Sequence, residues 1–193
     1  VKPGYELIIC CFALLFIGAI PIIIDPGMGL KSLLKCIKHS KPQTLIAINM
    51  GIWISTLFRT SFSSLRLKIR ITKNFLVGTK RKFRVNPSQM HYSQDKDLAA
   101  IVFTSGSTGP PKGVRYLHRN FNAQIQTLER EFGIQKGEVD MVTLPIFSLF
   151  NPALGVTSVI PEMNPRKPAK ANAEKLVQTI LDHQVTSAFC SPV

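Results

Sequence analysis

The chain has 193 residues, 45% of them hydrophobic and 18% charged, which argues against a disordered tail, a collagen-like chain and a coiled coil. Its formal net charge of +13 comes from 24 Lys and Arg against 11 Asp and Glu. The excess belongs to one segment, because no acidic residue lies between Asp25 and Asp95, whereas that stretch holds 13 basic residues. This distribution argues against a protein that coats nucleic acid with its whole surface and favours a near-neutral chain with a basic segment.

The first element is an uncharged apolar run from Leu7 to Ile24. Its length just reaches that of a membrane-span candidate, but Gly18 and Pro21 interrupt it, and β-branched residues follow Gly18. We therefore predict a buried helix, a glycine stop and a buried parallel strand at Ile22–Ile24, with a true span as the alternative. No signal peptide is recognisable, and the opening Val1 suggests a piece of a larger protein.

The next elements alternate between helix and strand. Apolar and basic residues alternate at helical spacing from Leu30 to His39, and a short buried strand is expected at Thr44–Ile48. Residues 65–72 alternate apolar and polar positions at period two, which predicts a half-buried strand. Such alternation favours a parallel sheet covered by helices.

The second half continues the pattern. We expect strands at residues 98–104, 141–144, 156–160 and 185–190, and a helix from about Asn120 to Phe132 with Phe121, Ile125, Leu128 and Phe132 on one face. A further helix is expected to begin at an Asn172 cap. Its predicted core stripe consists of Leu176, Val177, Ile180 and Leu181. The fold class is therefore α/β, with mostly parallel sheets flanked by helices.

Composition divides the chain into three parts: 1–58, a first α/β part; 59–94, the basic segment; and 95–193, a second α/β part. The purely structural interpretation of residues 59–94 is a solvated sheet edge. The functional alternative is a surface that binds nucleic acid or an anionic membrane. Sparse aromatics argue against nucleic acid. The four cysteines have no C-x-x-C spacing, so a reducing, cytoplasmic setting is the simplest expectation and no metal site is predicted.

One motif carries chemistry, a run of hydroxyl and glycine residues directly after the apolar strand that ends at Thr104. Glycines let backbone N–H groups approach phosphate oxygens, hydroxyls add donors, and a lysine adds mobile positive charge. The candidate phosphate-binding residues are Thr104, Ser105, Gly106, Ser107, Thr108, Gly109, Lys112 and Gly113. A plain surface turn is one alternative. A P-loop is the other, although Pro111 and Gly113 replace its glycine and its magnesium-binding hydroxyl.

The segment TSGSTGPPKGV closely resembles the signature phosphate loop of the adenylate-forming superfamily, which includes acyl-CoA synthetases and peptide-synthetase adenylation domains. GAIPIIIDP at 18–26, HRN at 118–120, LPIF at 144–147 and VTSAFCSPV at 185–193 are similar to further family segments in the same order. FSLFNPALGVTSVIPEMNP resembles the β-lactone synthetases of bacterial olefin biosynthesis, whose relatives are often labelled peptide synthase. The resemblance implies part of the N-terminal domain of such an enzyme.

The resemblance also implies a reaction. ATP and a carboxylic acid, fatty or β-hydroxy fatty, would give an acyl-adenylate and pyrophosphate, possibly followed by a β-lactone; thioester-forming and amino-acid-activating ligases are the alternatives. Phe147 and Ser148 are implied acyl-pocket residues, with Ser148 in place of a more usual histidine. The family's YG-x-TE segment, which would supply the magnesium-binding glutamate, is absent. We therefore expect the Mg²⁺ ligand outside this chain and the chain alone to be inactive.

Overall fold

The computed structural model describes residues 4–72, 90–104, 111–164 and 167–190. The chain forms two compact units. The first consists of Cys11–His118 with residues 1–2, and the second of Arg119–Val193 with residues 3–10. The three-part division expected from composition stays a prediction.

The first helix and strand follow the predicted order. Helix α1 (Tyr5–Phe16) ends before Gly18, whose φ of 71° is the left-handed conformation that glycine adopts readily. Strand β1 (Ile22–Ile24) comes next. Only Cys11 of α1 is buried, so the expectation of a buried helix was wrong: an apolar sequence does not guarantee that other elements cover it. Among the described residues, no helix combines the length and apolar character needed to cross a bilayer.

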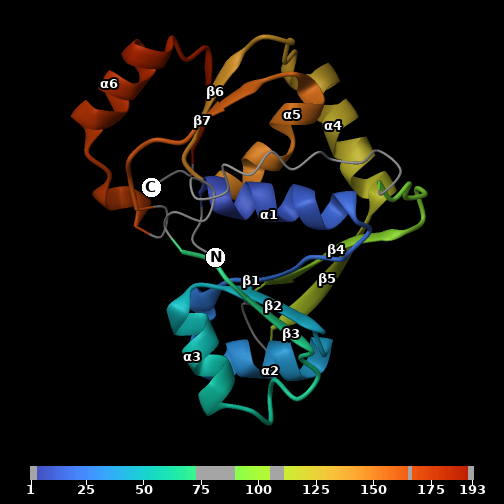
Figure 1. The fold of residues 1–193 in the computed structure, drawn as a ribbon. Coiled ribbons are helices and arrows are strands. Elements are labelled where there is room, and N and C mark those ends of the chain that lie inside the picture. The colour runs from blue at the N-terminus through green and yellow to red at the C-terminus, as the bar shows by residue number, and fades with distance from the viewer. Residues whose placement is uncertain (1–3, 73–89, 105–110, 165–166, 191–193) are drawn as a thin grey trace. The chain divides into compact units, whose positions relative to one another are not determined.

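The first unit is organised around strand β4 (Leu98–Thr104), which has a partner on each side. Strand β1 runs parallel to it, and β5 (Lys112–Leu117) runs antiparallel, in the order β1-β4-β5. Figure 1 shows the three strands side by side. Ala99, Ala100 and Phe103 of β4 are buried in the core. Strand β5 was not predicted, because a glycine and two basic residues dilute its apolar pattern.

A second, parallel strand pair in this unit joins β2 (Thr44–Ala47) to β3 (Leu67–Arg70). Between β1 and β2 come the short η1 (Pro26–Met28) and α2 (Leu30–Ser40). Helix α2 buries Ile37, which lies on its predicted apolar face, and also Cys36, which was not predicted to lie there. Helix α3 (Asn49–Leu57) follows β2 and was not predicted. The expected alternation of β3 is confirmed only in part, because Leu67 is 52% exposed.

The second unit contains α4 (His118–Phe132), which begins in the first unit and is two residues longer than expected at its start, and the parallel sheet β7-β6-β8. Its strands are β6 (Val139–Val142), β7 (Thr157–Val159) and β8 (Ser187–Phe189). The remaining elements are η3 (Pro145–Leu149), α5 (Asn151–Leu154), η4 (Pro168–Lys170) and α6 (Ala173–His183). Every strand pairing among the described residues is parallel except β4–β5, which confirms the predicted fold class.

Two predicted apolar helix faces are only partly covered. Phe132 of α4 is 74% exposed, and Val177 and Leu181 of α6 are 54% and 67% exposed, while Leu176 and Ile180 are half-buried. Periodicity identifies the apolar face of a helix, but it does not say that another element packs against that face. The full core stripe expected for α6 was therefore wrong.

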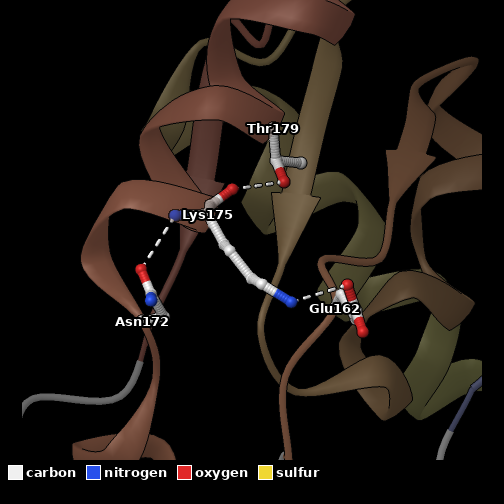
Figure 2. A network of polar contacts seen from close by, with 4 residues as sticks. All are labelled: Glu162, Asn172, Lys175 and Thr179. Carbon is white, nitrogen blue, oxygen red and sulfur yellow. Dashed lines mark hydrogen bonds and ion pairs between the residues drawn. The ribbon is translucent and has the colours of Figure 1, made fainter.

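The start of α6 is held by the predicted cap. The Asn172 side chain accepts a hydrogen bond of 3.1 Å from the Lys175 backbone N–H, and the Thr179 hydroxyl donates to the Lys175 carbonyl oxygen at 2.8 Å (Figure 2). The Lys175 ammonium also forms a 3.0 Å ion pair with Glu162 (Figure 2), but these side chains are 57% and 86% exposed. Water screens such a pair, so the cap is expected to contribute more than the ion pair.

We predict that Asn172→Ala lowers the free energy of unfolding by about 1 kcal/mol, because it removes the acceptor for a helix N–H. Asn172→Asp keeps an acceptor and should be neutral or better, and Glu162→Gln should change stability by less than about 0.5 kcal/mol. Urea denaturation followed by circular dichroism measures all three. Equal losses in Asn172→Ala and Glu162→Gln would contradict this ranking.

Candidate functional site

The predicted phosphate loop connects two strands that are paired with each other. In the β4–β5 register Thr104 lies opposite Lys112, and Phe103 lies opposite Gly113. Directly opposed residues of an antiparallel pair point to the same face of the sheet. The Thr104 hydroxyl and the Lys112 side chain therefore project from one face at the mouth of the loop, and both residues are exposed.

The loop itself lies mostly outside the described residues, which resume at Pro111. Predictions for Ser105, Gly106, Ser107, Thr108 and Gly109 fall there and stay predictions. Thr104, Lys112 and Gly113 are described, and the hairpin brings these three together. The two ends of the loop are thus fixed on neighbouring strand positions.

The hairpin removes the P-loop alternative. In a P-loop the lysine opens a helix, whose N-terminal amides bind phosphate. Here Lys112 opens strand β5, and the next helix, α4, begins only at His118. Any phosphate bound at this loop must therefore be held by loop amides, hydroxyls and the lysine rather than by the start of a helix.

Packing explains why position 113 is a glycine, in addition to its predicted role in phosphate binding. A Cβ built on Gly113 would lie 3.1 Å from Cζ and 3.2 Å from Cε1 of the Phe103 ring, and 3.3 Å from Ile101 Cγ2. Phe103 is 5% exposed and lies directly opposite Gly113 in the register. The missing side chain therefore gives the buried ring room to cross β5 one residue beyond Lys112.

The carboxyl ends of the two parallel strands meet at the same edge of the sheet. Because Ile24 pairs with Phe103, Asp25 follows β1 at the level where Thr104 ends β4. The Asp25 carboxylate accepts a 2.8 Å hydrogen bond from the Gly27 backbone N–H. Ligands of α/β sheets bind outside such carboxyl ends. We gave Asp25 no role from sequence, although the Asp-Pro turn after an apolar strand was the available signal.

The acyl-pocket candidates belong to the second unit. Phe147 and Ser148 lie in η3, which follows the carboxyl end of the central strand β6. Phe147 is 39% exposed, and its ring packs on Phe189 with 4.2 Å between centroids. Ser148 is 1% exposed. Phe147 therefore presents an aromatic surface, whereas Ser148 is part of the packed interior.

A polar cluster around the buried Asn151 holds the segment that follows η3. The Asn151 side-chain amide donates hydrogen bonds of 2.9 Å to Asp140 Oδ2 and of 2.9 Å to Ser158 Oγ. Asn151 is only 6% exposed, and its partners come from β6 and β7. Buried amides cost free energy unless they are paired, so this cluster fixes α5, and with it the end of η3, on the sheet. Sequence reasoning did not find Asn151.

The histidines and cysteines do not form a metal centre in the described residues. No group of three or more His, Cys, Asp or Glu is placed there to hold an ion. His91 packs against Gly18 near the amino end of β4, where Asp97 and His118 help to line a hollow of about 340 Å³. That hollow lies at the end of β4 opposite Thr104. Burial raises the pKa of the Cys36 thiol, which therefore resists ionisation.

The chain is similar in sequence to known proteins. The family model described as AMP-binding enzyme matches residues 1–193. The chain is 39% identical over 197 residues to an olefin beta-lactone synthetase of Stenotrophomonas maltophilia, and 40% identical over 198 residues to that of Xanthomonas campestris. Both alignments include the whole of this chain but only 36% and 35% of the two relatives. The chain therefore spans about a third of their length.

The fold matches a solved enzyme as well. An anthranilate CoA ligase solved in complex with anthranoyl-AMP aligns with a TM-score of 0.76 at 15% identity, over 98% of this chain and 38% of that one. The chain therefore shares the fold of part of this solved ligase. The chain belongs to the AMP-binding enzyme family, as its loop motif predicted.

We predict that Gly113→Val lowers the free energy of unfolding by about 1–3 kcal/mol, because the new side chain must displace the buried Phe103 ring. The effect should shrink in a Phe103→Leu background, where the smaller side chain leaves room. A double-mutant cycle by urea denaturation measures the coupling. Additive losses would contradict the steric role of Gly113.

Proposed function

We propose that the complete protein uses ATP to adenylate a carboxylic acid, fatty or β-hydroxy fatty, and releases pyrophosphate. The observation that carries the proposal is the pairing of Thr104 with Lys112 at the carboxyl end of β4, a strand that also pairs parallel with β1. This pairing fixes both ends of a hydroxyl- and glycine-rich loop at a sheet edge where ligands bind. Family membership supports the ATP-dependent class of reaction.

In the proposed first step, a substrate carboxylate oxygen attacks the α-phosphorus of ATP. A bond forms between that oxygen and phosphorus, and the bond to the β-phosphate oxygen breaks, so pyrophosphate leaves with the electron pair. Backbone amides and hydroxyls of residues 105–109 donate to the β- and γ-phosphates, as the motif predicts. Lys112 supplies positive charge as the leaving group becomes more negative. Thr104 contributes a hydroxyl at the same mouth.

For the second step we propose β-lactone formation. The β-hydroxyl oxygen attacks the acyl carbonyl carbon, the hydroxyl proton is lost, and AMP leaves. Because nucleophile and carbonyl are in one molecule, no separate thiol acceptor is needed. The names of the two relatives near 40% identity support this outcome over thioester formation or amino-acid activation. We assign Phe147, and the segment around Ser148, to the acyl group.

The magnesium ion expected with ATP has no cluster of ligands among the described residues. Magnesium is usually held by one or two carboxylates together with substrate phosphates. We propose that its protein ligand lies outside the 193 residues, because the YG-x-TE segment that the resemblance implies as its source is absent from the sequence. On this proposal the chain alone binds the phosphates incompletely.

We predict that the 193-residue chain alone shows no carboxylate-dependent ATP–pyrophosphate exchange, whereas the complete protein does. The proposed reason is that the magnesium-binding glutamate lies outside the chain. Exchange with fatty, β-hydroxy and amino acids in separate reactions measures both the activity and the preferred acid. Turnover by the isolated chain would contradict the proposed placement of these contacts.

In the complete protein, Lys112→Ala and Thr108→Ala should each lower exchange by about 10²-fold or more, because each removes charge or a donor that stabilises the leaving pyrophosphate. Lys170→Ala, which removes an exposed lysine of the second unit, is the matched control and should leave exchange unchanged. Circular dichroism verifies the fold of all variants. Wild-type exchange in both loop variants would remove the site assignment.

A further inference from the structure

Helix α3 has an unusual distribution of side-chain sizes. Its inner face carries small residues: Ser55 is 1% exposed, and a Cβ on Gly51 would lie 2.7 Å from Ala47 Cβ of β2. Its outer face carries large apolar ones. Met50, Trp53 and Leu57 are 67%, 79% and 77% exposed, and their spacing puts them on one stripe of the helix. The helix therefore presents its largest side chains to the outside.

The surroundings of this stripe are basic throughout. No Asp or Glu occurs from residue 26 to residue 94, and α3 itself has no charged residue. Figure 1 draws α2 and α3 below β2 and β3. The exposed basic residues described in this part of the unit are Lys31, Lys35, Lys38, Lys41, Arg59, Arg66, Lys68 and Arg70. Among the residues that the structure describes, none of these eight has an ion-pair partner, and the ion pair found there joins Lys175 to Glu162 in the other unit.

The basic groups also gather locally. Lys35, Lys38, His39 and Lys41 line an open hollow of about 520 Å³ at the end of α2. Lysines in the last turn of a helix are favoured by its dipole, but Lys31 in the first turn is opposed by it. Helix stability alone therefore does not account for a lysine at every exposed turn of α2.

We propose that the exposed apolar stripe of α3 docks on an anionic lipid bilayer, to which the exposed basic residues of this part of the unit attract the protein. Trp, Met and Leu on a short helix insert into the headgroup region, while lysines and arginines attract acidic headgroups. A second copy of the chain would bring two basic surfaces together, which like-charge repulsion disfavours. Nucleic acid would satisfy the charges but offers no apolar environment to Met50 and Leu57. The inference is independent of the adenylation chemistry.

Trp53 is the sole tryptophan of the chain, so its emission reports this surface directly. We expect a blue shift when the 193-residue chain meets phosphatidylcholine vesicles that contain phosphatidylglycerol, and no shift with pure phosphatidylcholine. Co-sedimentation of the complete protein with the same vesicles should show the same preference. It should weaken as salt is raised, because the attraction is screened.

Two sets of variants test the two components. Met50→Ser with Leu57→Ser should abolish the blue shift and reduce sedimentation, and Val177→Ser with Leu181→Ser, which alters exposed apolar residues of α6, is the matched control. Lys35→Glu with Lys38→Glu should weaken binding about tenfold or more, whereas Lys167→Glu with Lys170→Glu should not. All eight positions are exposed, and unchanged thermal midpoints verify folding.

Three outcomes would overturn the proposal. One is equal binding of the complete protein to neutral and anionic vesicles, or no binding to either. Another is tight, salt-dependent binding of a duplex DNA without vesicle binding, which would make the basic surface a nucleic-acid site. The third is a concentration-dependent blue shift of Trp53 emission without lipid, which would show that self-association buries the apolar stripe of α3.

Discussion

The candidate site depends on strand β4, which is paired with another strand on each of its two sides. Strand β4 is held by β1 in parallel and by β5 in antiparallel register, so neither end of the loop after Thr104 is free to move. The glycine at 113 lets the buried Phe103 ring cross the hairpin immediately beside Lys112. Packing in the core therefore positions a lysine and a threonine at the sheet edge, where we propose that the phosphates bind.

The candidate loop joins two paired strands, which differs from a phosphate loop at the start of a helix. A helix N-terminus offers aligned amides and a dipole, both of which are built into the helix. A hairpin loop has no such dipole, so its glycines and hydroxyls must supply the donors themselves, and the lysine supplies the charge. If the loop binds phosphate as we propose, that difference accounts for its richness in Ser, Thr and Gly.

Sequence predicted the elements whose local pattern matched their surroundings. Strand β4, helix α2 and the Asn172 cap of α6 each have an apolar run, an amphipathic period or a cap residue that fits the structure. Strand β5 was missed because pairing with β4, rather than its own sequence pattern, stabilises it as a strand. Gly113 would weaken an isolated strand, but the Phe103 ring opposite it leaves little room for a side chain. Helix α3 was missed because its small inward face and large outward face reverse the usual pattern. Asn151 and Asp25 gain their surroundings only from tertiary contacts, which a local pattern does not contain.

The most direct test of the central claim is a crystal structure of the complete protein with a non-hydrolysable ATP analogue. The account predicts β- and γ-phosphate oxygens within hydrogen-bond distance of the backbone amides of residues 105–109, with the Lys112 ammonium within about 4 Å of a phosphate oxygen. A triphosphate bound elsewhere, with this hairpin loop left free of nucleotide, would contradict it.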